Sequence, residues 1–434
     1  MTPGARLAAA IEVLADIGAR RRPAPDALKD WGLSHRFAGS GDRAAIAGLV
    51  YDTLRRRASA AFMMADDSPR GTALGMLVRE RQLDPDAVAR LADGSGYAPP
   101  ALTDTERAKL TAADVSGAPA HVRGDYPEWL DPHLQKVFGD ERAEEGAALA
   151  SRAPLDLRVN TLKGERDEAQ AEFADLKPAP TRWSPQGLRI VLAADAKNPA
   201  VHAEPAYLKG LVEVQDEGSQ IAALLAAAKP GEQVLDLCAG GGGKTLALAA
   251  AMANKGQLYA TDDDKRRLAP IHDRLTRAGA RNVQVRTPKS NGTELDDLKG
   301  RLDLVLIDAP CTGIGAWRRN PDAKWRVRPG ALEVRVKEQV GVLDRAAALV
   351  KPGGRIAYIT CSVLDEENGA QVRGFVERHS GFTIASPAEV MTGALGERAY
   401  LFRRAVLTSD EGLLMTPRRT DTDGFFVSIL RRAI

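Results

Sequence analysis

The chain has 434 residues, of which 44% are apolar and 27% are charged, and its formal net charge is +2. This composition is that of a globular protein with two or three domains, and so small a net charge says little about partners. No run of about 18 apolar residues occurs, which excludes a membrane-spanning helix. We therefore expect no membrane partner.

The cysteines and the N-terminus set expectations about location. Cys238, Cys311 and Cys361 are the only cysteines, and none forms a CxxC pair, so we expect no metal site. In the first 22 residues the arginines follow the apolar part, the reverse of a secretory signal. Few cysteines and no export signal indicate a reducing compartment. We expect a cytoplasmic protein and, since nothing indicates oligomerisation, a monomer.

Residues 1–145 are predicted to form a helical domain. Apolar residues recur at helical spacing, first at Leu7, Ile11, Leu14 and Ile17, and again from Ile46 to Leu54. Arginine triplets at 20–22 and 55–57 close these two segments. They are compatible with two interpretations, which the sequence leaves open: favourable placement at helix C-termini, or contact with RNA.

Residues 146–215 are predicted to form a small α+β module. Residues 155–159 alternate as a half-buried strand, residues 188–192 resemble another, and a helical segment around 166–175 lies between them.

Residues 216–434 alternate strands and helices, the pattern of a doubly wound α/β sheet. The predicted strands are residues 233–238, 257–261, 283–286, 303–308 and 355–359, with an edge strand at 423–430. We expect a Rossmann-like domain, which holds its ligands at the carboxyl ends of the strands.

A glycine loop follows the first of these strands, in the stretch DLCAGGGGKT that begins at Asp236. Such glycines let backbone amides approach a ligand closely. The ending GKT imitates a phosphate loop, but that motif needs a glycine where Cys238 stands, which disfavours a nucleotide triphosphatase. Asp262 ends the next strand, about 20 residues on, where a carboxylate suits a ribose hydroxyl of a nucleoside cofactor.

Asp308 and Cys311 follow the buried run LVLI, and Pro310 and Gly313 end that strand. Residues 311–330 contain five Lys or Arg, two Trp and one carboxylate. A basic and aromatic loop is suited to phosphates and unstacked bases. We predict RNA contact for four of its residues: Arg318, Arg319, Lys324 and Arg326.

Cys311 and Cys361 end two strands that are predicted to be neighbours, whereas Cys238 fits a small buried apolar residue. A thiolate is a strong nucleophile, and two thiols with Asp308 and Lys244 suit attack on a pyrimidine. Carbon 5 of cytosine is too weak a nucleophile to take a methyl group unaided. A thiolate that adds to carbon 6 makes carbon 5 enamine-like, and a carboxyl group near ring nitrogen 3 would assist.

With these motifs the sequence resembles the Sun/Fmu family of RNA (cytosine-5)-methyltransferases, especially its bacterial RsmB-like branch. The motifs VQDEGSQ, LDLCAGGGGKT, DAPCTGIGAWRRNPDAKW, KPGG and TCSVLDEEN occur in family order, followed by DGFF. The first 140 residues resemble the NusB-like RNA-binding domain of that branch. The LRVNT segment resembles the family's small RNA-recognition-like module.

The resemblance implies S-adenosylmethionine as methyl donor, small-subunit ribosomal RNA as substrate, and roles for particular residues. Cys361 would be the nucleophile, Cys311 would assist product release, and Asp308 and Lys244 would complete the catalytic site. The cofactor would be bound by Asp262, Asp308 and the loop of Cys238, Ala239, Gly240, Gly241, Gly242, Gly243 and Lys244. DAPC stands where amino-group methyltransferases carry an NPPY-like motif, which argues against that chemistry.

Two departures from the family pattern affect the cofactor. Gly240 and Gly241 replace Ala and Pro, which keeps the loop amides. Lys289 stands where a carboxylate is usual near the adenine, and it cannot accept a hydrogen bond, although Asn291 offers a side-chain oxygen. Two alternatives therefore stay open: an RNA-binding assembly factor without catalysis, and an enzyme that acts on transfer RNA.

Overall fold

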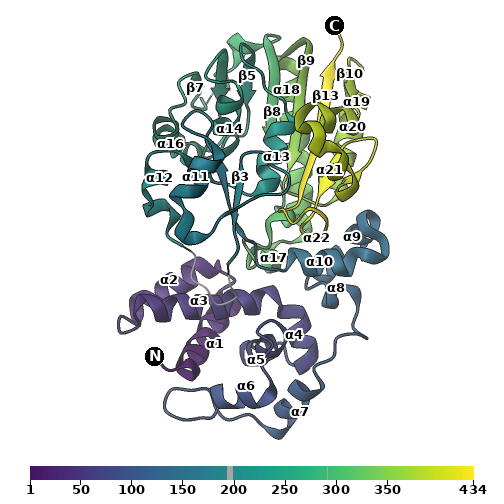
Figure 1. Cartoon of the computed structure of the whole chain (residues 1–434). Helices are drawn as coiled ribbons and strands as arrows, with labels where there is room; N and C mark the ends of the chain where they lie inside the picture. The colour runs from purple at the N-terminus through teal and green to yellow at the C-terminus, as the bar shows by residue number, and fades with distance from the viewer. Residues whose placement is uncertain (193–198, 291) are drawn as a thin grey trace. The chain divides into compact units, whose positions relative to one another are not determined.

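The computed structural model describes residues 1–192, 199–290 and 292–434, which group into two compact units (Figure 1). Unit 1 contains residues 1–152 together with 317–328, and unit 2 contains 153–192, 199–316 and 329–434. Asn291 lies outside the described residues. The three-domain division therefore stays a prediction, and residues 317–328 group apart from the catalytic region that surrounds them in the sequence.

Unit 1 is helical, as the spacing of its apolar residues predicts. The buried face of α1 carries Leu7, Ala10 and Val13. Pro3 and the N-cap Thr2, whose hydroxyl accepts from the amide of Ala5, define the start of this helix. The α-helices are α1 (Pro3–Arg20), α2 (Ala24–Ser34), α3 (Ser40–Arg55), α4 (Arg57–Met64), α5 (Pro69–Arg79), α6 (Pro85–Leu91), α7 (Asp104–Ala112), α8 (Ala120–Arg123), α9 (Asp131–Phe138), α10 (Arg142–Leu149) and α17 (Ala323–Arg326).

The segment 317–328 satisfies the C-terminal end of α3. Helices leave their last carbonyl groups without intrahelical partners. Trp325 Nε1 donates to the carbonyl of Leu54 at 2.6 Å, and Lys324 Nζ donates to that of Arg55 at 2.9 Å. Arg55 in turn donates to the carbonyl of Arg318 at 2.6 Å. The side chain of Trp325 packs against the helical core, so the segment completes unit 1.

Unit 2 contains a small antiparallel sheet in the order β2-β3-β1-β4. Its strands are β1 (Leu155–Val159), β2 (Ala179–Pro180), β3 (Gly187–Ile190) and β4 (Val212–Val214), with α11 (Arg166–Glu172) and α12 (Pro205–Leu208). Leu157, Phe173 and Leu188 are buried in its core. The predicted α+β elements are therefore present.

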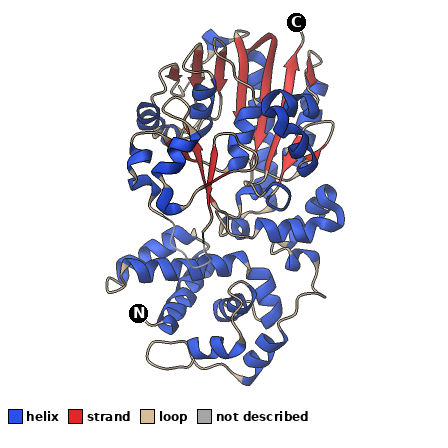
Figure 2. Cartoon of the chain, in the orientation of Figure 1, coloured by secondary structure: helices blue, strands red, loops and turns tan. Residues whose placement is uncertain are grey.

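The large sheet of unit 2 has the order β11-β12-β13-β9-β8-β5-β6-β7, and β10 pairs with β13 (Figure 2). The five strands from β9 to β7 in this order are parallel, and β13 is antiparallel to β9. Their bounds are β5 (Gln233–Asp236), β6 (Gln257–Ala260), β7 (Val283–Val285), β8 (Leu302–Asp308), β9 (Val350–Thr360), β10 (Phe382–Ile384), β11 (Leu407–Thr408), β12 (Leu413–Met415) and β13 (Phe425–Arg432).

This order confirms the Rossmann-like prediction, with two differences. The last strand, β13, is not an edge strand, because it lies between β9 and β12. The KPGG segment belongs to β9, which begins at Val350 and shifts register against β8 before Arg355. A bulge of this kind adds residues to one strand without ending the pairing.

Helices cover both faces of the large sheet. Helices α13 (Glu217–Leu225), α14 (Gly243–Ala251), α20 (Pro387–Leu395) and α21 (Ala399–Ala405) contribute to one core with the strand residues Val234, Leu304 and Ala357. Helix α18 (Pro329–Leu349) packs against β8 and β9 from the other side (Figure 1). The remaining helices are α15 (Lys265–Leu268), α16 (Ile271–Ala278), α19 (Gly369–Arg378) and α22 (Pro417–Thr420). In the described part of the chain, no helix has the length and apolar character needed to cross a membrane.

Candidate active site

The glycine loop joins the end of β5 to the start of α14, as predicted. Gly242 adopts a left-handed conformation with φ of 84°, and a Cβ atom there would lie 2.5 Å from the side chain of Ile271. Only glycine therefore fits this turn. At Gly240, whose φ is 49°, a Cβ atom would lie at ordinary contact distance from the side chains of Arg267 and Asp262, 3.6 and 3.9 Å away, so the backbone conformation and not the space favours glycine here. Burial raises the pKa of Cys238, which fits its predicted structural role.

Asp236, at the end of β5, anchors the start of α14. Its Oδ2 accepts from the hydroxyl of Thr245 at 2.7 Å, and the carboxyl group is fully buried. Desolvation raises the pKa of Asp236 to about 7. The neighbouring carboxylate of Asp308 contributes to this rise, because a second negative charge disfavours ionisation.

Asp262 follows β6 and lies against the glycine loop. Its Oδ2 accepts from the amide of Gly240 at 2.9 Å, and its Oδ1 accepts from the amide of Asp264 at 3.0 Å. Each carboxylate oxygen has a second lone pair, so both can still accept a hydroxyl hydrogen bond. This buried carboxylate beside the glycine loop fits the ribose of a nucleoside cofactor.

Two charged residues that the sequence analysis did not identify hold the glycine loop in place: Arg274 contacts it directly, and Glu213 binds Arg274. Arg274 on α16 donates to the carbonyl of Gly241 at 2.7 Å and to Glu213 at 3.0 Å. Glu213, on β4, also pairs with Arg277. The sequence does not distinguish an arginine of an amphipathic helix that binds a loop from one that is only exposed to water.

Lys244 and Asp308 form a direct ion pair. The distance from Lys244 Nζ to Asp308 Oδ2 is 2.7 Å. The lysine is 6% exposed and its Nζ lies 5.0 Å from the centre of the Phe425 ring, whereas the aspartate is 36% exposed. The ammonium group is therefore fixed inside the protein, and the carboxylate remains accessible to a ligand.

The two predicted active-site thiols are in contact. The sulfur atoms of Cys311 and Cys361 lie 3.3 Å apart, following β8 and β9. The hydrogen bond with Cys361 and the loss of solvent raise the pKa of Cys311 well above its usual range. The thiol of Cys311 therefore stays protonated at neutral pH.

A polar network behind the thiols fixes both strand ends. Glu367 accepts from the amide and the hydroxyl of Thr312 at 2.8 and 2.5 Å, and Gln339 donates to Glu367 and to the carbonyl of Pro310. The carbonyl of Glu367 accepts from the hydroxyl of Tyr358 at 2.7 Å. Sequence reasoning assigned no role to Glu367, although the motif TCSVLDEEN contains it.

The loop after β7, which contains Lys289, contacts the carboxylate of Glu294. The side chain of Lys289 is exposed, and its amide donates to Glu294 Oε2 at 3.2 Å. Glu294 is buried and also pairs with Arg345 of α18. A buried acceptor therefore lies against this loop, six residues past Pro288 in the sequence.

The four residues predicted to contact RNA differ in exposure. Arg318 and Lys324 are each 1% exposed, while Arg319 is half-buried and Arg326 is exposed. The bond of Lys324 to the carbonyl of Arg55 gives it a role within unit 1. The basic character of the loop thus arises partly from side chains that solvent does not reach.

Comparison with known proteins identifies the family. A family model described as 16S rRNA methyltransferase RsmB/F matches residues 222–431, and a model for the ferredoxin-like domain of RsmF/B-like methyltransferases matches 126–197. A probable ribosomal RNA small subunit methyltransferase B from Synechocystis sp. is 31% identical over 311 residues, 71% of this chain and 67% of that protein. The chain belongs to the RsmB/F methyltransferase family.

Other relatives agree with this assignment. The ribosomal RNA small subunit methyltransferase B of Salmonella arizonae is 35% identical over 263 residues, which is 60% of each chain. The chain thus aligns with about 60–67% of the length of these relatives. A methyltransferase homolog protein of Pyrococcus horikoshii has the same fold, with a TM-score of 0.57 and 24% identity, over 72% of this chain and 97% of that one.

Members of this family are S-adenosylmethionine-dependent methyltransferases. The glycine loop between β5 and α14 and the buried Asp262 carboxylate fit that cofactor, whose nucleoside needs backbone amides and a ribose acceptor.

Proposed function

We propose that the protein methylates carbon 5 of a cytosine in RNA, with small-subunit ribosomal RNA as the substrate class. The observation that carries this proposal is the pair of thiols 3.3 Å apart, in the same unit as the Lys244–Asp308 ion pair. A single cysteine can activate a cytosine, but a second thiol has a use only if the adduct must later be released. An rRNA substrate also implies a cytoplasmic enzyme.

In the proposed reaction, Cys361 attacks carbon 6 of the base as a thiolate, and a bond forms between sulfur and carbon. The raised pKa of Cys311 favours this division of labour, because Cys311 retains its proton. The carboxyl group of Asp308 interacts with ring nitrogen 3 during the addition, and Lys244 holds Asp308 in place. S-adenosylmethionine, when bound, supplies an electrophilic methyl group to the activated carbon 5.

Release requires loss of the proton from carbon 5. When a base takes this proton, the electron pair of the bond between carbon 5 and hydrogen re-forms the double bond between carbons 5 and 6. The bond from Cys361 to carbon 6 breaks, and its electron pair leaves with the sulfur. We assign assistance of this elimination to Cys311, because its sulfur contacts that of Cys361. Residues 238–244 together with Asp262 would hold the cofactor during the cycle.

Nucleoside mass spectrometry of fractionated RNA from cells with and without the gene tests the proposal. We expect 5-methylcytosine to disappear from small-subunit rRNA in cells without the gene, and the purified protein to restore it on an unmodified transcript. Loss only from transfer RNA would retain the mechanism and contradict the substrate class.

A second candidate is an RNA-binding assembly factor without catalysis, which the exposed Lys289 favours. Calorimetry with S-adenosylmethionine separates the two. We expect Glu294 to compensate for Lys289, so that the dissociation constant stays in the micromolar range and the Glu294→Gln variant binds more weakly. No measurable binding, together with no methylation of any transcript, would support the assembly factor.

A further inference from the structure

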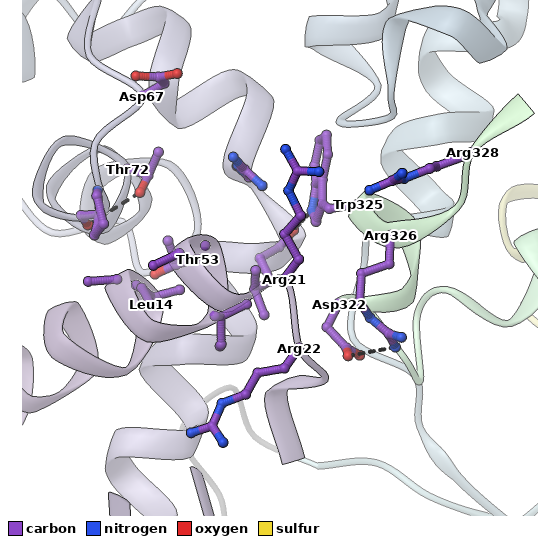
Figure 3. Close-up of a pocket in the computed structure, with 17 residues that line it drawn as sticks. Leu14, Arg21, Arg22, Thr53, Asp67, Thr72, Asp322, Trp325, Arg326 and Arg328 are labelled. Atoms are coloured by element: carbon purple, nitrogen blue, oxygen red, sulfur yellow. Dashed lines mark hydrogen bonds and ion pairs between the residues drawn. The ribbon is translucent and has the colours of Figure 1, made fainter. Parts of the chain in front are cut away.

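A cavity of about 790 Å³ lies within unit 1, lined by the C-terminal end of α1, the junction of α3 and α4, and residues of the 317–328 segment (Figure 3). Five of its lining residues are arginines and two are aspartates. The arginines come from three separate parts of the sequence: Arg21, Arg22, Arg57, Arg326 and Arg328. We call this feature the arginine cavity.

The first arginine triplet, residues 20–22, contains two arginines that form ion pairs and one, Arg21, that only lines the arginine cavity. Arg20 and Arg22 both pair with Asp16, and Arg22 also pairs with Asp30 at 2.5 Å. Arg21 is exposed, lines the cavity and has no ion-pair partner in the described part of the chain. Ion pairing therefore accounts for Arg20 and Arg22 but not for Arg21, which is the C-cap residue of α1 with a φ of 50°.

The second triplet, residues 55–57, likewise contains two arginines that bond within unit 1 and one, Arg57, that lines the arginine cavity. Arg55 is buried and bonds to backbone carbonyls, and Arg56 pairs with Glu80 at 2.5 Å. Arg57 is exposed and lines the cavity, and among the described residues it has no carboxylate partner. Its guanidinium group lies over the ring of Trp325, 5.5 Å from the ring centre. This stacking restricts the side chain, which lowers the entropy that binding would cost.

The 317–328 segment supplies the other side of the arginine cavity. Arg326 pairs with Asp322 at 3.0 Å, and Asp322 also accepts from the amide of Ala24, so this carboxylate is already compensated. Arg328 is exposed and, within the described residues, forms no ion pair. Three guanidinium groups therefore remain uncompensated around one exposed carboxylate, that of Asp67.

We propose that the arginine cavity binds the phosphodiester backbone of the RNA substrate through Arg21, Arg57 and Arg328. This inference rests on the proposed function and adds an anchoring site in unit 1, separate from the thiols of unit 2. Guanidinium groups bind phosphates with paired hydrogen bonds, and three of them around one cavity offer more hydrogen-bond donors than a single phosphate group uses. The contacts hold the strand without reading its sequence.

The test measures binding of the full-length protein to an unmodified transcript of small-subunit rRNA at several salt concentrations. The test variant is Arg57→Gln with Arg328→Gln. The matched control is Arg36→Gln with Arg90→Gln, which removes the same charge from exposed arginines of unit 1 that lie outside the cavity and lack described ion pairs. All four side chains are exposed, so both variants should keep the thermal midpoint of the wild type.

We expect the cavity variant to bind on the order of ten-fold more weakly near physiological salt. Its slope of log affinity against log salt should fall by about 1.4, since each phosphate contact on a single strand contributes about 0.7. The control should keep the wild-type slope, and both variants should bind S-adenosylmethionine normally.

If the wild type methylates the transcript and the cavity variant, the control and the wild type have equal slopes of log affinity against log salt, this inference alone is overturned. The cavity would then bind an acidic protein or no partner. If the wild type neither binds nor methylates the transcript, the proposed function fails and this inference with it.

Discussion

The strand ends of unit 2 and the 317–328 segment of unit 1 use buried lysines in opposite ways. Lys244 pairs directly with a carboxylate that is open to solvent. Lys324 donates to a backbone carbonyl, and desolvation lowers its pKa to about 7. A buried cation with an accessible partner is suited to chemistry, whereas one that only completes a helix end is suited to assembly. The difference separates Lys244, which we propose to be catalytic, from Lys324, which completes a helix end.

The thiol pair gives the sharpest test of the catalytic side of this comparison. Cys361→Ala should reduce turnover to background, because no nucleophile remains to activate the base. Cys311→Ala should instead leave a protein–RNA adduct that survives denaturing electrophoresis, since release is impaired. The wild-type protein is the control and should turn over without accumulating this adduct. If the first two variants exchange behaviour, the assignment of nucleophile and helper is reversed.

The two lysines can be compared by the same substitution. Lys244→Met should lower kcat by about 10²-fold, the usual scale for loss of a group that positions charge in an active site. Lys324→Met should change kcat at saturating RNA by less than about three-fold, since among the described residues Lys324 forms its hydrogen bond within unit 1. Single-turnover methylation with saturating RNA provides the measurement. Equal losses in the two variants would remove the distinction.

The pH dependence of unfolding tests the structural lysine. The folded-state pKa of Lys324 is about 7 and its ordinary value is 10.5, so between these values the unfolded chain binds more protons. Wild-type stability should therefore rise relative to Lys324→Met as the pH increases from about 7 to 10. Urea unfolding at several pH values measures this difference, and a difference independent of pH would contradict the assigned desolvation.

Asp236 should show a weaker effect of opposite sign. Its folded-state pKa of about 7 lies above the ordinary 3.8, so the folded protein binds more protons between these values. Wild-type stability should fall relative to Asp236→Asn as the pH rises from about 4 to 7. The asparagine keeps an oxygen for the hydroxyl of Thr245, so the helix start is retained. Calorimetric unfolding midpoints of both proteins across this range provide the comparison.

The sequence predicted the strand-end residues because their geometry follows from topology. Parallel strands end at one edge of a sheet, so residues after β5, β6, β8 and β9 converge whatever the details of packing. Which basic side chains of residues 311–330 are buried and which are exposed could not be predicted in this way. Lys324 is buried because its partner lies 269 positions earlier in the chain, and no local pattern distinguishes it from the exposed Arg326. Similarly, Glu367 and Gln339 act through contacts with a distant loop.

The partners of Trp325 have a consequence for the order in which the protein is made. Its indole bonds to the end of α3, and its ring packs against the core formed by the first 110 residues. Because the ribosome delivers the chain from its N-terminus, α3 lacks this partner until Trp325, 271 residues after Leu54, has been synthesised. Unit 1 begins to fold first yet is completed late, and a nascent chain stopped before residue 317 would expose the surface that the segment covers.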